Sequence, residues 1–261
     1  MKNTEHCNPI SGSRFKFVGC EVFFRQVCKA AAGSGRVIDL EFTKTASHDD
    51  PGKLRRSVQD KIEKASALGI YDAVLLGYGL CGNAVNGIHA LNIPVVIPRA
   101  HDCCTVFLGS RKEFIRHFGE LRSAEWSSPG YMERGDNGFH DPAPRGLLGG
   151  GRKYEDLVRE HGEENARYVM DMLAPAPPER QTMFFIKDAG TDNGKYIAKA
   201  RETAALKKVK LKVLSGSARL INRLLSGRWN DEFLILRPGQ RIEAVYDDFE
   251  ILKASDGPGN A

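Results

Sequence analysis

Three short apolar runs, each followed closely by a cysteine, constrain the fold of this chain most. They are residues 15–19 before Cys20, residues 74–77 before Cys81 and residues 95–97 before Cys103. Apolar runs of this length, bounded by turn signals, are typical of buried strands. Ligands of an open α/β sheet bind outside the carboxyl ends of its strands. If the three strands are parallel neighbours, we expect their three thiols to converge on one crevice.

Strand and helix patterns alternate through most of the chain. The spacing of Leu54, Val58, Ile62 and Ala65 predicts a helix over residues 53–68 that Gly69 ends. We expect further strands at 36–42, 183–186, 211–214, 233–236 and 242–246, and further helices at 21–32, 83–91, 153–173, 195–208 and 218–225. One more helix is expected to start at Cys103 or Ser110. This alternation predicts a Rossmann-like α/β fold, with a mainly parallel sheet flanked by helices.

Composition indicates how the chain is organised. We expect a flexible leader over 1–13, a single α/β domain over 14–253 and a flexible tail over 254–261. Within the domain, the predicted parts are a cysteine-bearing half (14–125), an irregular, helical lid insert (126–180) and a second βα-rich half (181–253). The segment 130–151 is rich in glycine and proline, and loops of this length are usually functional or disordered.

Composition also narrows the compartment and the partners. The first residues are polar and unlike a secretory signal, so we expect a cytoplasmic protein whose six cysteines stay reduced. No apolar run approaches the roughly 18 residues of a membrane span. The net charge is +5, and the lysines of 207–212 alternate with apolar residues, which is typical of a solvated strand face. We therefore expect a small-molecule substrate, no nucleic acid and no membrane; a homo-oligomer stays open.

Cysteine and histidine side chains follow the first four predicted strands. A zinc or iron site formed by Cys20, Cys81, His101 and Cys103 is the main hypothesis, with an iron–sulfur cluster as an alternative. Cys20 starts a predicted helix, where the local field lowers the pKa of a thiol. His48 is an alternative fourth ligand or a general base. Each residue alone is more simply explained by packing or by exposure, so the hypothesis depends on their joint position.

Other residues near these ligands are candidates for catalysis or cofactor binding. Glu21, with Cys81, His101 and His48, is a candidate catalytic residue. Candidate cofactor-binding residues are Tyr78, Gly79, Asn83 and Arg99. Glycines around Cys81 permit positive φ and the close approach of a ligand, although a tight strand-to-helix turn explains them equally well. An arginine such as Arg99 can hold a carboxylate or phosphate, or form a surface salt bridge.

Three motifs of this chain resemble domain-of-unknown-function family 1638 (DUF1638). They are residues 19–21 (Gly-Cys-Glu), 75–83 (Leu-Leu-Gly-Tyr-Gly-Leu-Cys-Gly-Asn) and 98–103 (Pro-Arg-Ala-His-Asp-Cys). Supporting segments are His48 with Pro51 and Leu54, residues 128–131, residues 220–229 and residues 237–239. Members of this family are bacterial and archaeal and are often found near corrinoid-dependent methyltransferase systems. The resemblance therefore implies a setting in one-carbon metabolism, with a corrinoid protein or a methyltransferase as a partner.

Three functions remain open from the sequence. The first is a metal-dependent enzyme, with methyl transfer as the favoured reaction because a zinc-bound thiolate is nucleophilic at neutral pH. The second is a carrier or chaperone that holds a metal, an iron–sulfur cluster or a corrinoid without catalysis. The third is a metal-free enzyme with Cys81 or Cys103 as nucleophile.

Overall fold

The strands of the chain form three sheets. The computed structural model describes residues 13–45, 50–119, 124–134, 154–173, 182–188, 190–245, 247 and 249–256. The strands are β1 (Arg14–Cys20), β2 (Val37–Thr43), β3 (Ala73–Gly77), β4 (Val95–Pro98), β5 (Trp126–Ser127), β6 (Thr182–Lys187), β7 (Lys210–Ser215), β8 (Phe233–Leu236), β9 (Gln240–Ala244) and β10 (Leu252–Asp256). The helices are η1 (Glu21–Phe23), α1 (Phe24–Ala32), α2 (Pro51–Leu68), α3 (Cys103–Leu108), α4 (Arg111–Phe118), α5 (Pro129–Glu133), α6 (Tyr154–His161), α7 (Glu163–Leu173), α8 (Gly194–Lys207) and α9 (Arg219–Ser226).

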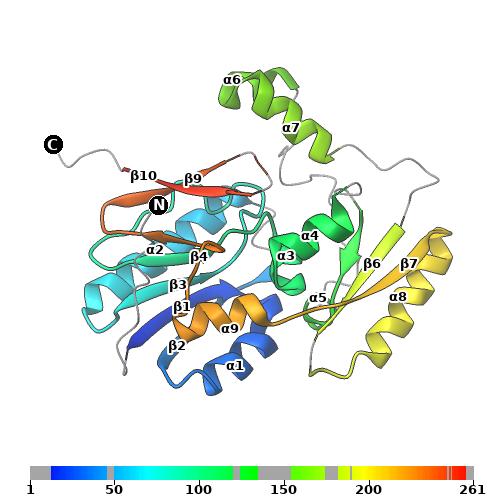
Figure 1. Cartoon of the computed structure of the whole chain (residues 1–261), viewed down its shortest axis with the longest axis horizontal. Helices are drawn as coiled ribbons and strands as arrows, with labels where there is room; N and C mark the ends of the chain where they lie inside the picture. The colour runs from blue at the N-terminus through cyan, green and yellow to red at the C-terminus, as the bar shows by residue number, and fades with distance from the viewer. Residues whose placement is uncertain are drawn as a thin grey trace.

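The largest sheet has the strand order β2-β1-β3-β4-β8 (Figure 1). Strands β1 to β4 are parallel, and β8 pairs antiparallel with β4 at the edge. The chain winds from β1 outward to β2, then returns past β1 to β3. With right-handed crossovers, this reversal places α1 and α2 on opposite faces of the sheet. The point between β1 and β3, where the winding changes direction, is the usual ligand position in such sheets.

The core of this sheet depends on close contact between β1 and β3. All five residues of β3 are buried, as expected for a strand covered on both faces. Gly19 and Gly77 are paired in register, and a Cβ on either would lie 2.4 Å from the ring of Phe17. The two glycines therefore make room for one aromatic ring, which packs the sheet directly below its carboxyl edge.

A second, smaller parallel sheet has the order β5-β6-β7 (Figure 1). Helix α8 connects β6 to β7 and packs against both strands. Strands β9 and β10 form a separate antiparallel pair. The predicted α/β class with mainly parallel pairing is confirmed, and the second βα-rich half forms a sheet of its own.

Several predicted boundaries differ from the structure. The segment 83–91 forms turns rather than a helix, because Asn83 and Gly87 have positive φ, which interrupts a right-handed helix. The helix expected from Cys103 or Ser110 consists of two helices, which Gly109 separates at φ 80°. Residues 254–256, at the start of the predicted tail, belong to β10. The helix expected over 153–173 is divided at Gly162 into α6 and α7.

Some predictions fall partly or wholly on residues that the structure does not describe. The leader up to residue 12, the segment 135–153 of the predicted lid and the end of the tail from 257 lie outside the described ranges. Within those ranges, no helix is both long and apolar enough to cross a membrane.

Candidate functional site

The structure brings three thiols together at the carboxyl ends of β1, β3 and β4. Cys20 is the last residue of β1, Cys81 follows β3, and Cys103 starts α3 directly after β4. The Sγ atoms of Cys81 and Cys103 are 3.9 Å apart, and the Cys103 thiol also contacts that of Cys20. Cys20 and Cys103 are buried, whereas Cys81 is half-buried. The cluster therefore lies beside the position where the winding of the sheet reverses, with one thiol closest to solvent.

The turns after β3 and β4 are held against each other by backbone hydrogen bonds. The amide of Leu80 donates to Ala100 O at 2.8 Å, and that of Cys81 donates to His101 O at 2.9 Å. Gly79 permits this approach, because a Cβ there would lie 2.7 Å from the backbone of Asp102. The predicted cofactor-binding residue Gly79 thus has a packing role that fixes the distance between the two thiol-bearing turns.

Cys81 belongs to a short left-handed stretch of backbone. Cys81, Gly82 and Asn83 have φ values of 46°, 64° and 67°. For a residue with a side chain this conformation costs about 1–2 kcal/mol, and less for asparagine. Such strain concentrates at functional sites, where the surrounding structure enforces it. The left-handed turn is the local cause of the position of the Cys81 thiol beside Cys103.

The thiols differ in their acidity. Contact with the Cys103 thiol is the main cause that lowers the pKa of Cys20, and the amide of Val22 and the guanidinium of Arg134 act in the same direction, against the effect of burial. The pKa of Cys103 is raised well above its usual value by its contacts with Cys20 and Cys81 and by burial. The contact therefore favours ionisation of the Cys20 thiol over that of Cys103.

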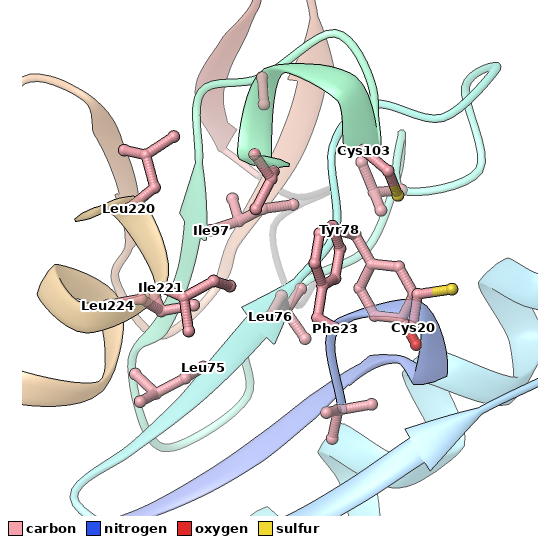
Figure 2. Packing of buried hydrophobic residues seen from close by; sticks show 14 of the residues in the cluster. Cys20, Phe23, Leu75, Leu76, Tyr78, Ile97, Cys103, Leu220, Ile221 and Leu224 are labelled. Atoms are coloured by element: carbon pink, nitrogen blue, oxygen red, sulfur yellow. The ribbon is translucent and has the colours of Figure 1, made fainter. Parts of the chain in front are cut away.

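Two buried tyrosines border the thiols. Tyr78 lies next to Cys20 and Cys103 (Figure 2), and its hydroxyl is 2.8 Å from Oγ1 of Thr43. Tyr131 of α5 is 3% exposed, and its hydroxyl contacts the Cys103 thiol. Burial raises the pKa of both phenols, and the neighbouring thiols raise it further. Both side chains therefore stay neutral beside the cluster.

Glu21 lies directly after Cys20 and joins three segments. Its carboxylate accepts a hydrogen bond of 2.9 Å from the amide of Thr45, and it forms ion pairs with Lys44 at 3.4 Å and Arg134 at 3.9 Å. The carboxylate thus holds Arg134 near Cys20 and anchors the loop that leads to residue 46. His48 lies outside the described residues.

The structure places His101 and Asp102 in roles that spacing does not show. The ring of His101 lies against that of Phe114, with centroids 5.8 Å apart. The carboxylate of Asp102 caps α3 by accepting from the amide of Thr105 at 3.1 Å. Burial of this carboxyl raises its pKa to about 6, although the residue as a whole is only half-buried.

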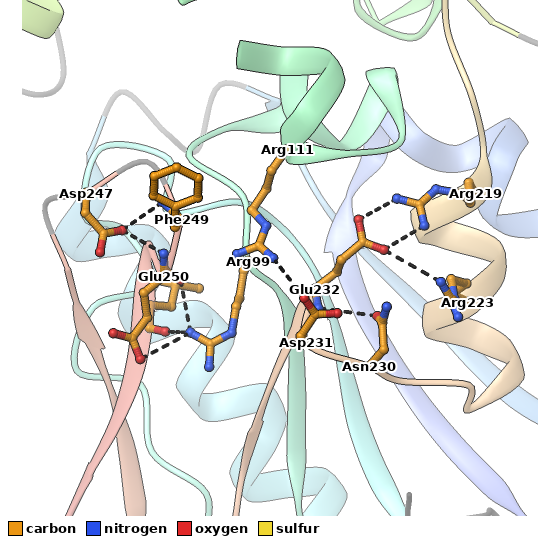
Figure 3. A network of polar contacts seen from close by, with 11 residues as sticks. Arg99, Arg111, Arg219, Arg223, Asn230, Asp231, Glu232, Asp247, Phe249 and Glu250 are labelled. Carbon is orange, nitrogen blue, oxygen red and sulfur yellow. Dashed lines mark hydrogen bonds and ion pairs between the residues drawn. The ribbon is translucent and has the colours of Figure 1, made fainter. Parts of the chain in front are cut away.

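Arg99 and Asn83 make contacts that serve the fold. The guanidinium of Arg99 donates to the carbonyls of Glu250 and Leu252, so it binds the C-terminal segment (Figure 3). The carbonyl of Asn83 accepts a 2.6 Å hydrogen bond from Arg55 of α2. Their predicted role in cofactor binding stays a prediction.

The donor set fits a thiophilic metal in spacing, although it is not assembled as a finished site. Among the described residues, no group of three or more His, Cys, Asp or Glu side chains is arranged to hold a metal ion. Two sulfur ligands of a tetrahedral zinc ion, each about 2.3 Å from it, lie about 3.8 Å apart. The 3.9 Å between Cys81 and Cys103 matches this separation.

Sequence reasoning missed the contribution of α5. Its first turn packs on η1, since a Cβ at Gly130 would lie 2.0 Å from Val22 O, and it carries Tyr131 to the cluster. Arg134 follows the same helix. The segment 128–131 was a visible signal, because it is one of those that support the family resemblance.

The strand order and the cysteine cluster define an α/β protein with a three-thiol site where its sheet reverses direction. The family model described as "Protein of unknown function (DUF1638)" matches residues 42–225. This match covers more than half of the chain, which therefore belongs to that family, as the resemblance predicted. The matched range includes Cys81, His101 and Cys103 and starts after Cys20. A search of curated proteins found no match.

Proposed function

We propose that Cys20, Cys81 and Cys103 bind a zinc or iron ion through their thiolates. The observation that carries the proposal is the meeting of three thiols from three separate segments of the chain at one point of the sheet edge, with 3.9 Å between Cys81 and Cys103. Metal ligation needs deprotonated sulfur, and the lowered pKa of Cys20 favours the thiolate form at this position. His101 or His48 would complete the ligand set.

Packing alone does not account for this cluster. The neighbouring Cys104 shows what a packed cysteine looks like here: it is fully buried, and burial raises the pKa of its thiol. Cys81 instead occupies a strained backbone conformation. If the residue only filled space in the core, nothing would require this strain. The cost is understandable if the thiol has a chemical role.

The more specific proposal is that the protein is an enzyme of one-carbon or corrinoid-linked metabolism and that it transfers a methyl group. A thiolate-ligated metal would supply an activated thiolate or water at neutral pH. Around the site, Arg134 would orient an anionic substrate, and the neutral phenol of Tyr131 would donate a hydrogen bond. The family resemblance supports this setting, with a corrinoid protein or methyltransferase as partner.

Metal content tests the first step. We expect protein purified without oxygen or chelator to hold about one zinc or iron per chain, measured by mass spectrometry. Cys81→Ser and Cys103→Ser should lose that metal. The matched control is Cys104→Ala, which removes a buried thiol outside the cluster, with Cys28→Ser as a half-buried control. Absence of metal from the folded protein, even after incubation with zinc or ferrous ion, would overturn the proposal.

A metal-free thiol enzyme is the second candidate. It is supported by Cys81, a predicted nucleophile with Cys103 and the half-buried thiol of the cluster, and by the lowered pKa of the neighbouring Cys20. Iodoacetamide should then alkylate Cys20 at a lower pH than an ordinary thiol requires. Cys103→Ala should move that profile toward higher pH, because it removes the main cause of the lowered pKa. An unchanged profile would contradict this candidate.

A third role, carriage without catalysis, stays open beside these two. A carrier would bind the metal, cluster or corrinoid but would show no turnover with a methyl donor and a thiol acceptor. Turnover that is lost in Cys103→Ser, but kept in Cys104→Ala, would favour the enzyme.

A further inference from the structure

A second site lies at the carboxyl ends of β6 and β7. A cleft of about 1280 Å³ lies between the turns after these strands and the helices α1 and α9. Residues 188, 190 and 191 follow β6, residues 216–218 follow β7, and the remaining walls are formed by the two helices with the residues next to them. Ligands of parallel sheets bind in this position, and the thiol cluster is absent from the lining.

The cleft is strongly cationic. Five of its lining residues carry a positive charge: Arg25, Lys29, Arg219, Arg223 and Arg228. Asp188 is in the lining, while Glu133 pairs with Arg25, and Glu232 pairs with both Arg219 and Arg223 (Figure 3). Five cations against three carboxylates leave two positive charges in excess. Among the described residues, neither Lys29 nor Arg228 has a carboxylate within ion-pair distance, and both side chains are exposed.

The ammonium group of Lys29 lies against the turn after β6. A Cβ at residue 190 would lie 2.8 Å from Nζ of Lys29, and Gly190 has φ 84°. The glycine therefore leaves the space that the ammonium group occupies. Asn193 fixes the turn, because its side chain accepts from the amide of Asp188 at 3.0 Å and donates to the carbonyl of Thr191 at 2.7 Å.

Gln26 supplies a buried acceptor in the same cleft. It is 4% exposed, and its Nε2 donates to Oδ1 of Asp188 at 2.8 Å. This bond fixes the orientation of the amide, since the carboxylate can only accept. Its carbonyl oxygen Oε1 has no hydrogen-bond partner among the described residues. A buried acceptor without a donor costs about 1–3 kcal/mol. A ligand hydroxyl or amino group would recover this cost if it displaced the atoms that cover Oε1.

We propose that this cleft binds a small phosphate ester, with Lys29 and Arg228 on the phosphate and Gln26 Oε1 on a hydroxyl or amino group of the ester. Guanidinium groups match phosphate oxygens in a bidentate manner, and a lysine ammonium adds a point charge. An ester can place its phosphate on the cations and a separate hydroxyl or amino group on Gln26, whereas inorganic phosphate has only its own P–OH groups to offer as donors. The site does not depend on the metal or on the three thiols.

Calorimetric titration of the full chain tests the proposal. The probes are inorganic phosphate, ribose 5-phosphate, AMP and a single-stranded RNA. We expect at least one of the two esters to bind more tightly than inorganic phosphate. Lys29→Ala and Arg228→Ala should each weaken that binding about tenfold. Both side chains are exposed, so circular dichroism should show folded variants; Lys64→Ala, an exposed lysine on α2, is the matched control.

Gln26→Leu keeps the approximate shape of the side chain and removes the acceptor. It should weaken the binding of the ester and leave the binding of inorganic phosphate unchanged. The proposal is overturned if neither ester binds, if the two cation variants bind like Lys64→Ala, or if RNA binds and the esters do not. Equal binding of inorganic phosphate and both esters would overturn the role of Gln26.

Discussion

The two parallel sheets of this protein present different chemistry at the same topological position. At the carboxyl edge of the large sheet, three sulfur atoms meet between tightly packed turns with Tyr78 beside them. At the carboxyl edge of the small sheet, a wide cleft exposes Lys29 and Arg228. Under our two proposals, the first edge ligates a metal ion through sulfur and the second binds an anion of larger size.

The difference lies in where the chemical groups come from. The thiols belong to the strand ends and turns themselves, so the sheet fixes their distances. The cations come mainly from α1, α9 and the residues after α9, and the strands supply only the floor. A strand-end site is therefore sensitive to backbone packing, while the cleft is sensitive to charge.

Helix α1 connects the two edges. It starts at Phe24, directly after the η1 turn that follows Cys20, and its outward residues line the cleft. Arg25 of this helix pairs with Glu133 at 2.7 Å, at the end of the same α5 that carries Tyr131. A shift of α1 on binding an anion would therefore act on both elements that border the thiols.

A substitution that disturbs backbone packing should give the largest difference between the two edges. Gly79→Ala places a Cβ 2.7 Å from the backbone of Asp102, so the two thiol-bearing turns must separate. We expect a loss of about 3 kcal/mol in the free energy of unfolding, because neither backbone can move cheaply. Phosphate-ester binding in the cleft should be unchanged in the fraction that stays folded. Urea denaturation and calorimetry measure the two quantities.

Two matched glycines complete this test. Gly216→Ala places a Cβ 2.3 Å from Lys187 O in the floor of the cleft, so it should cost as much stability but disturb the cleft. Gly33→Ala meets nothing closer than 3.7 Å and should be close to neutral. If Gly79→Ala behaves like Gly33→Ala, the turns are not held as tightly as the hydrogen bonds indicate.

Much of the fold follows from local patterns. The helix α2 is signalled by its apolar spacing and by Gly69, which ends it at φ 63°, and the structure adds Asp50 as its N-cap. The buried strand β3 is signalled by a continuous apolar run. By contrast, β5 has two residues and pairs only with β6, which follows more than 50 residues later. Such a strand exists through a distant partner, so no local pattern predicts it.

Part of the candidate chemistry can likewise be predicted from local sequence, and part of it cannot. The strand-end cysteines were found because apolar run and thiol are adjacent in the sequence. The cleft was missed because Gln26 and Asp188 meet across 162 positions, and single charges on helices resemble ordinary solvated faces. For His101 the structure shows a ring contact with Phe114, which the sequence does not predict, and its role as a metal ligand stays a prediction.

Asp102 offers a test based on pH. Its pKa is raised to about 6 from an ordinary value near 3.8. The folded protein therefore binds this proton more tightly than the unfolded chain does, and stability falls as pH rises from about 4 to 6. The total loss is about 1–3 kcal/mol, with the lower figure set by the half-buried position of the residue. Asp102→Asn keeps the cap without the charge, so this loss should disappear.

The expected result is equal stability of wild type and Asp102→Asn near pH 4 and a more stable variant at pH 7, measured by urea denaturation. Asp188 is the counterpart at the second edge, where its carboxylate accepts from Gln26 at 2.8 Å and Thr191 at 3.1 Å. Asp188→Asn should destabilise the protein at pH 7, because the amide has one oxygen acceptor where the carboxylate accepts at both of its oxygens. A gain in stability at pH 7 from Asp188→Asn, or no gain in stability at pH 7 from Asp102→Asn, would contradict this contrast.

The smallest effect concerns the strained turn at Cys81. Glycine adopts φ 46° without the steric cost of a side chain, so Cys81→Gly should raise stability by about 0.5–1 kcal/mol, after allowance for the greater freedom of the unfolded chain. Asn83→Gly should gain less, because asparagine tolerates this region. Lys208→Gly, at φ 56° after α8, is the control at the second sheet. Under reducing conditions with a chelator, a gain from Cys81→Gly together with loss of metal binding would show that the chain keeps a strained cysteine for its thiol. A loss of stability would mean instead that the contact with Cys103 outweighs the strain.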